Sequence, residues 1–200
     1  VLNHNLLDDM DLAIASIRRE VQRMLLLTEE MMLPIMDLFQ KYDKTRMKKI
    51  VKKDLIINEA LNGTRRYVAE LSGITGVKSG SSAQRKELNN LLEFAIAIEA
   101  AGDVISKTLS NLAANKDRNG IRFSSEGLTE LKNMHDTVIA NISLAGNVLV
   151  SSDVGIARRL LEEKNEFTSD ANSLELLIWP QAAHGGEQLH TSLARPHVLQ

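Results

Sequence analysis

The chain has 200 residues, 44% of them hydrophobic and 25% charged, with a formal net charge of −2 at pH 7. This length can bury a core without disulfides or metals, and the composition excludes intrinsic disorder and nucleic-acid binding driven by charge alone. The absence of cysteine excludes disulfides, thiolate zinc sites, iron–sulfur clusters and cysteine nucleophiles. Few aromatics and three prolines, against many Leu, Ala, Ile, Met, Glu and Lys, favour long helices and exclude an all-β fold.

The first predicted element is one long helix over residues 8–40. Apolar side chains recur there at alternating steps of three and four residues, which is the spacing of a helix seam. The seam consists of Leu7, Met10, Ile14, Ile17, Val21, Met24, Met31, Ile35 and Leu38, with Thr28 as its one polar member. Asp8, Asp9 and Asp11 suit the positive N-terminal end of the helix dipole. Pro34 should kink the helix.

The same spacing predicts a second helix over residues 45–72 and a third over 82–115. The seam of the second helix is apolar apart from Thr64 and one charged residue, Asp54. Glycines and serines between these two helices indicate a flexible loop, and Ser81 or Ser82 could cap the third helix.

A fourth helix is predicted to begin at Ser124 or Ser125, and a weaker fifth helix from about residue 153. The pattern stops at Trp179-Pro180, so we expect an irregular tail. The expected domains are therefore a three-helix unit, 1–118, a second unit lacking its last helix, 119–178, and the tail, 179–200. Short connections favour antiparallel packing, so the fold class is an all-α, antiparallel bundle of long helices.

Two acids on the third helix are candidate metal ligands. Glu99 and Asp103 lie one turn apart, where like charges repel by about 0.2–0.5 kcal/mol, so a cation, a basic residue or water should compensate. Lys107, one turn further on, could pair with Asp103, and a solvated face with this salt bridge is the simpler interpretation. Antiparallel packing could instead bring Asp54 and Asn58 opposite the two acids, giving oxygen ligands suited to magnesium, calcium, manganese or iron.

Asp54 strengthens the metal hypothesis, because a carboxylate on an apolar seam is costly to bury unless it is paired or binds a metal. The competing interpretation is that Lys53 or Arg66 neutralises it near a bundle end. For His135, which also lies on an apolar seam, a histidine bonded to the backbone or to Asp136 is favoured over a ligand.

Catalysis has no specific support in the sequence, so we expect no enzyme. There is no Gly-x-Ser-x-Gly turn, no phosphate-binding loop of the Walker type and no Gly-x-Gly-x-x-Gly fingerprint. The basic stretch 46–53 is ordinarily a solvated helix face. Beneath an anionic membrane, however, each of its charges could contribute on the order of 1 kcal/mol to orienting the domain.

The residues quoted so far resemble a known family. Asp54-Leu-Ile-Ile-Asn58 on the second helix and Glu99-Ala-Ala-Gly-Asp103 on the third are similar to the acidic E/D-x-x-x-D motifs of PhoU domains. The opening Leu-Asp-Asp-Met-Asp-Leu-Ala-Ile-Ala-Ser-Ile-Arg-Arg-Glu-Val-Gln-Arg-Met resembles the PhoU-like region that follows the membrane domain of bacterial sodium/phosphate cotransporter family proteins. Asn58 departs from the motif, because the family has an acid there.

The resemblance implies a cytoplasmic regulatory domain of a sodium-dependent phosphate transporter, which modulates phosphate uptake at the cytoplasmic face of the inner membrane. It also implies an N-terminal membrane phosphate-permease domain in the parent chain, and metal ligation by Glu99, Asp103 and Asp54. In the second unit, Lys164 and Thr168 stand where paired acids are expected, so no second metal cluster is predicted.

The alternative function is a free-standing helical protein-interaction module with no metal or transport role. No apolar run reaches the roughly 18 residues of a membrane span, so we expect the visible chain to be soluble. The chain begins without methionine, and we expect it to be a fragment of a longer protein. The second unit without its last helix should leave apolar surface exposed, which predicts a homodimer or a contact with the parent chain.

Overall fold

The computed structural model of the chain describes residues 2–73, 80–151, 153–165 and 168. All regular structure in these residues is helical, without strands, which confirms the predicted all-α fold. The chain divides into two units, Val1–Leu161 and Glu162–Gln200. In the second unit the described residues, 162–165 and 168, are helical.

The first long helix breaks at the proline, as the sequence predicts. After a short 3₁₀ turn, η1 (His4–Leu6), helix α1 spans Met10–Met32 and α2 spans Ile35–Gln40. The Asp9 carboxylate caps α1 by accepting hydrogen bonds from the first-turn backbone N–H groups of Asp11 and Leu12. Pro34 lies at the break because it has no N–H to donate and its ring disfavours a continuous helix.

The second and third predicted helices are present, and the third changes its pitch. Helix α3 spans Lys44–Gly73 and α4 spans Ser82–Asp103. Ser81 caps α4 through a capping box with Gln84, as predicted for one of the two serines. The helix continues as a π-helical segment, η2 (Val104–Leu109), and then as α5 (Ser110–Arg118). Most of the predicted loop, 74–79, lies outside the described residues.

The fourth predicted helix is α6, Ser125–Ser151, and residues 154–161 are also helical. The remainder of the fifth helix beyond residue 165, apart from 168, and the predicted tail lie outside the described residues. Nothing in the structure tests the division into 1–118, 119–178 and 179–200, which stays a prediction.

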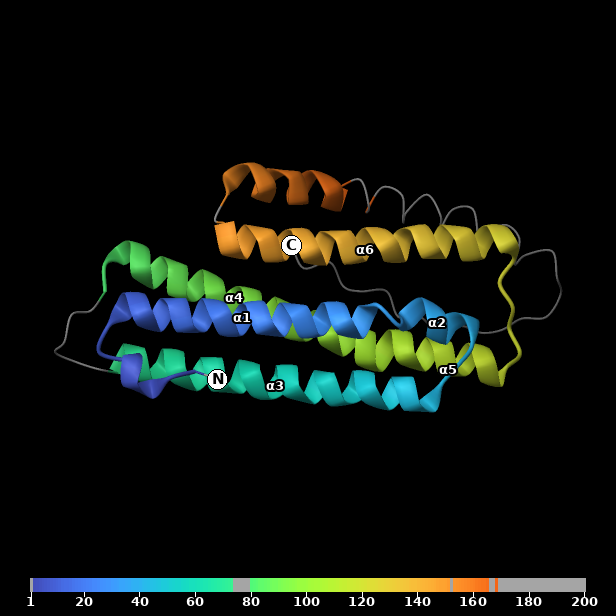
Figure 1. Ribbon diagram of the computed structural model, residues 1–200, viewed down its shortest axis with the longest axis horizontal. Helices are drawn as coiled ribbons and strands as arrows, with labels where there is room; N and C mark the ends of the chain where they lie inside the picture. The colour runs from blue at the N-terminus through green and yellow to red at the C-terminus, as the bar shows by residue number, and fades with distance from the viewer. Residues whose placement is uncertain (1, 74–79, 152, 166–167, 169–200) are drawn as a thin grey trace, which may run out of the picture. The chain divides into compact units, whose positions relative to one another are not determined.

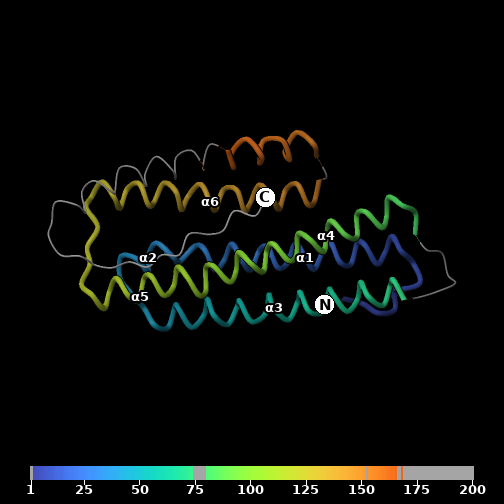
Figure 2. Tube along the Cα trace, turned by 180° about the vertical axis from the view of Figure 1, so that it is seen from behind, coloured from blue at the N-terminus to red at the C-terminus, as the bar shows by residue number. Residues whose placement is uncertain are grey.

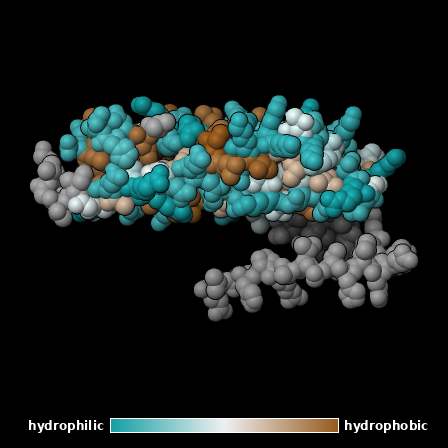
Figure 3. All heavy atoms as spheres, turned by 90° about the horizontal axis from the view of Figure 1, so that it is seen from below, coloured by the Kyte–Doolittle hydropathy of each residue, from teal (hydrophilic) through white to brown (hydrophobic). Residues whose placement is uncertain are grey.

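Helices α1, α3 and α4 pack against one another and form the core of the first unit. Figures 1 and 2 show α1 lying between α3 on one side and α6 on the other. The fully buried core side chains include Ile17, Met24, Met31 and Ile57 from the predicted seams, and also Tyr67, which lies outside them. On the side of α3, hydrophobic residues interrupt a mostly hydrophilic surface (Figure 3).

Helix α6 packs antiparallel on α1. The carbonyl of Met32 lies 3.0 Å from His135 Nε2, and Ser143 Oγ donates a hydrogen bond of 2.9 Å to Glu29. His135 is the one buried residue of α6, whose apolar residues are otherwise only partly covered. Helix α6 therefore buries fewer side chains against the core than α1, α3 and α4 bury against one another.

Candidate functional site

Asp54 is a buried carboxylate at the packing of α3 against α4. It occupies a seam position of α3, so the helix turns it inward with its apolar neighbours, and the residue is only 5% exposed. Its Oδ1 atom lies 3.3 Å from the position that a Cβ would take on Gly102 of α4. Among the described residues, Oδ1 has no hydrogen-bond partner. Burial of such a group is costly unless a charge nearby compensates.

The positive charge near this carboxylate is Lys107. Its Nζ atom forms an ion pair of 2.6 Å with Asp103 Oδ1, which confirms the salt bridge considered from the sequence. The pKa of Lys107 is raised, chiefly by its hydrogen bond to Asp103; desolvation opposes this rise, and the negative charges of Asp103, Asp54 and Glu99 add smaller contributions to it. The three acids therefore act on one ammonium group, and that group is largely exposed.

The fourth predicted ligand, Asn58, does not reach across to α4 with its amide nitrogen. Asn58 Nδ2 donates a hydrogen bond of 3.2 Å to the backbone carbonyl of Asp54, one turn earlier in the same helix. The structure thus brings Asp54, Glu99 and Asp103 to the surroundings of Lys107, whereas Asn58 is tied to its own backbone.

The fit of a metal ion can be judged from these positions. Carboxylate oxygens and a buried carboxylate atom without a partner suit a hard cation such as magnesium or manganese. The positions of these side chains do not suit a metal ion. Within the described part of the chain, no three His, Asp or Glu side chains lie close enough together to hold one. Metal ligation by Glu99, Asp103, Asp54 and Asn58 stays a prediction.

The competing interpretation named Lys53 or Arg66 as the residue that neutralises Asp54, and for Lys53 it is wrong. Lys53 Nζ forms an ion pair of 2.6 Å with Glu30 of α1. The two neighbouring residues point in different directions, because consecutive residues of a helix are about 100° apart around its axis. Lys53 is therefore turned away from the core position that Asp54 occupies.

Sequence reasoning missed the π-helical segment that follows Asp103. Within it, Ser106 Oγ donates to the carbonyl of Asp103 at 3.4 Å, and at its end Ser110 Oγ donates to the carbonyl of Ile105 at 3.0 Å. π-Helical turns are frequent at functional sites, and this one adjoins the acid pair. The one hint in the sequence was the pair of serines one turn apart, Ser106 and Ser110, since serine can bond back to helix carbonyls.

His135 is a structural histidine, as predicted. Its ring is buried, with Nε2 3.0 Å from the carbonyl of Met32 and Nδ1 3.3 Å from Asp136 Oδ1. Both ring nitrogens thus have protein partners. The side chain joins α6 to the C-terminal end of α1 and is not available as a ligand.

These contacts define a helical bundle with a carboxylate buried between two of its helices and one exposed lysine near it. Curated relatives align with most of its length. The protein named "Putative inorganic phosphate export protein YjbB" of Salmonella typhimurium is 30% identical over 168 residues, which is 83% of this chain and 30% of the relative. The protein of the same name of Escherichia coli is 26% identical over 167 residues, again 83% of this chain and 30% of the relative.

The chain therefore spans about 30% of the length of the curated relatives it matches. No family model matches the chain, and no solved structure matches it. In the described residues, no helix combines the length and the apolar character needed to cross a membrane.

Proposed function

We propose that this chain is a regulatory, non-enzymatic part of a phosphate transporter. The observation that carries the proposal is the 30% identity over 83% of the chain to a protein whose name describes inorganic phosphate export. The chain corresponds to about 30% of that relative, so the rest of such a protein has room for a transport domain. The resemblance of the acidic motifs to PhoU domains supports a regulatory task for the helical part.

The proposed partner is a membrane phosphate-permease domain in the same parent chain, and the proposed location is the cytoplasmic face of the inner membrane. The sequence resemblance implies sodium-dependent uptake, whereas the relatives are named for export. Regulation can act on either direction of phosphate movement, so the test has to measure both.

The structural basis of the proposal is the balance of charge around Asp54. Asp54 lies against Gly102 in the core, and Lys107 supplies the positive charge near the three acids. A change of charge at this cluster alters how closely α3 and α4 can pack, because a buried carboxylate without compensation favours separation of the helices. Helix packing is the route by which the domain would act on the permease.

The test uses cells that carry the natural parent gene or a version from which the segment encoding this chain is deleted. Uptake and efflux of radiolabelled phosphate are measured in both, with the membrane protein quantified by immunoblot. We expect the deletion to change the rate or the phosphate dependence of transport at equal protein level. Equal transport in both directions would contradict a regulatory role.

The free-standing interaction module remains the competing function, and the partly covered apolar residues of α6 favour it. The gene distinguishes the two. Codons for membrane spans upstream of the first codon of this sequence support the transporter, whereas a start codon close to it supports the free-standing module.

A further inference from the structure

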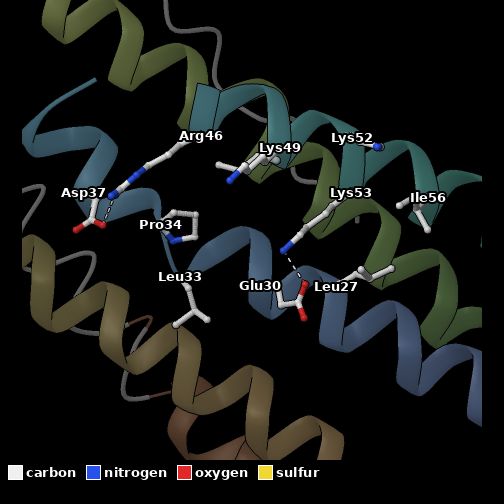
Figure 4. A pocket seen from close by; sticks show the side chains of 11 residues that line it. Leu27, Glu30, Leu33, Pro34, Asp37, Arg46, Lys49, Lys52, Lys53 and Ile56 are labelled. Atoms are coloured by element: carbon white, nitrogen blue, oxygen red, sulfur yellow. Dashed lines mark hydrogen bonds and ion pairs between the residues drawn. The ribbon is translucent and has the colours of Figure 1, made fainter. Parts of the chain in front are cut away.

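A groove with an apolar floor lies between the bend that joins α1 to α2 and the first turns of α3 (Figure 4). Its volume is about 630 Å³. Leu27, Leu33, Pro34 and Ile56 supply aliphatic lining, and Leu33 is 54% exposed. An apolar surface of this kind gains free energy when something covers it.

The rim of the groove is basic, and two of its four cations have acidic partners. Arg46 pairs with Asp37, and Lys53 pairs with Glu30 at 2.6 Å (Figure 4). Both pairs join α3 to the α1–α2 segment across the groove. These pairs span the groove and involve both of the acids that line it.

Lys49 and Lys52 are the other two cations. Both side chains line the groove and are exposed, and within the described part of the chain neither forms an ion pair. With the two lining acids balanced by Arg46 and Lys53, the lining keeps an excess of two positive charges, and the acid beside it, Asp43, acts on Arg46 and Lys49. The charge of the groove is therefore complementary to an anionic ligand.

A stripe beside the groove repeats the combination of lysine and exposed aliphatic side chains. Lys48, Val51, Lys52 and Leu55 recur at i, i+3, i+4 and i+7, so they share one side of α3. Val51 is 39% exposed and Leu55 is 58% exposed. A purely solvated helix face carries polar residues instead. Figure 3 shows hydrophobic residues among hydrophilic ones on the α3 side.

We propose that the groove and the stripe together dock on the surface of an anionic lipid bilayer. Lys49 and Lys52 would contact headgroup phosphates, while Leu33 and Leu55 enter the interfacial layer. Free inorganic phosphate could bind the lysines but would make no favourable contact with the aliphatic lining. A phospholipid surface can bind the lysines through its headgroups and cover the aliphatic side chains as well. The long lysine stems can lie along apolar surface with their charges at the headgroups.

The composition of the surface favours a bilayer over an acidic protein partner. Lysine is depleted at protein–protein interfaces, where tryptophan, tyrosine and arginine carry most of the binding energy. The groove and the stripe contain three lysines for the anion, Lys48, Lys49 and Lys52, and no aromatic residue. The inference rests on the proposed function only in expecting a membrane beside the chain.

The test is co-sedimentation of the purified chain with vesicles of phosphatidylcholine alone or with about one quarter phosphatidylglycerol added, a negatively charged surface that attracts lysine. We expect binding to the anionic vesicles only, weakened by salt. Loss of one lysine contact should weaken binding about fivefold, and Lys49→Gln with Lys52→Gln about 25-fold. Excess inorganic phosphate at constant ionic strength should leave vesicle binding in place.

The control for total charge is Lys86→Gln with Lys132→Gln, which removes two positive charges from α4 and α6 outside the surface; Lys132, unlike Lys49 and Lys52, pairs with Asp136. Equal losses in the two variants, equal binding to both vesicles, or no vesicle binding would overturn the proposal. If inorganic phosphate displaced the chain from the vesicles, the lysines would be a binding site for free phosphate, which would also overturn the proposal. Vesicle binding together with unchanged phosphate transport on deletion would support membrane docking and contradict the proposed function. Altered transport without vesicle binding would support the proposed function and contradict membrane docking.

Discussion

Asp54 Oδ1 lies 3.3 Å from the point where a side chain on Gly102 would begin. The glycine thus leaves the space in which the carboxylate is buried between α3 and α4. A Cβ at that distance forces one neighbour to move, and the neighbours are a buried carboxylate, Ile57 and Met31 of the core. The charge of the cluster and the closeness of the two helices are therefore linked at one contact.

Gly102→Ala should stabilise the protein less than an ordinary helical Gly→Ala change does. In helix interiors that change contributes roughly 0.5–1 kcal/mol. Gly63→Ala of α3 is the matched control, because a Cβ there meets no atom within 4 Å. Urea unfolding should show the expected gain for Gly63→Ala and little gain or a loss for Gly102→Ala. Equal gains would show that the carboxylate moves aside freely.

Asp54→Asn should raise the free energy of unfolding of the metal-free protein. The substitution removes a buried charge whose Oδ1 has no partner among the described residues, and the penalty for such a group is about 1–3 kcal/mol. Glu93→Gln, an exposed change on α4, should stay within about 0.5 kcal/mol of the parent. A loss of stability for Asp54→Asn would instead show that the nearby positive charge of Lys107 compensates the buried carboxylate.

The seams make the helices predictable from sequence, because apolar periodicity, the proline at 34 and the serine cap at 81 act within one element. Contacts between helices are harder to predict from the sequence. The Asp54–Gly102 contact depends on how two antiparallel helices align, and no local pattern encodes that alignment. Lys53 is adjacent to Asp54 in the sequence yet pairs with Glu30, because helix geometry directs the two side chains apart.

The groove beside the basic stretch 46–53 also could not be predicted from the sequence. Its lysines are obvious in the sequence, but the aliphatic groups that line the groove with them come from the α1–α2 bend. The π-helical segment after Asp103 could not be predicted from Ser106 and Ser110 alone, because serines bond back to carbonyls in ordinary α-helices as well.

His135→Ala should loosen α6 from α1. The substitution leaves the buried carbonyl of Met32 without its partner and removes the one buried side chain of α6, so we expect a loss of about 1–3 kcal/mol. Hydrogen exchange should accelerate in α6 more than in α3. Asn133→Ala, an exposed change two residues away, is the control and should leave exchange in α6 unchanged.

Elemental analysis tests the predicted metal site directly. The purified chain is dialysed against a weak chelator, and its iron, manganese, magnesium and calcium are measured beside those of a Glu99→Ala, Asp103→Ala variant. Near-stoichiometric metal that disappears in the variant would establish the acids as ligands. An exposed-acid control, Glu93→Ala with Asp117→Ala, should retain the metal. Absence of metal in all three proteins would contradict the prediction.

The predicted homodimer can be tested at the apolar surface beside α6. A hollow of about 420 Å³ is lined there by Phe94, Leu149, Val154 and Leu160, and Val154 is 72% exposed. If a second copy covers it, Val154→Glu should weaken the dimer at least about tenfold, because burying a valine contributes roughly 1.5–3 kcal/mol.

Light scattering over a range of concentrations measures the effect on dimerisation. Leu112→Glu introduces the same charge at another exposed aliphatic position, on α5, and should leave the dimer intact. Equal weakening by both variants would place the contact elsewhere. If the unsubstituted chain stays monomeric at every concentration, the predicted dimer is contradicted. The surface would then be expected to contact another part of the longer parent protein, because an exposed apolar patch of this kind marks an interaction site.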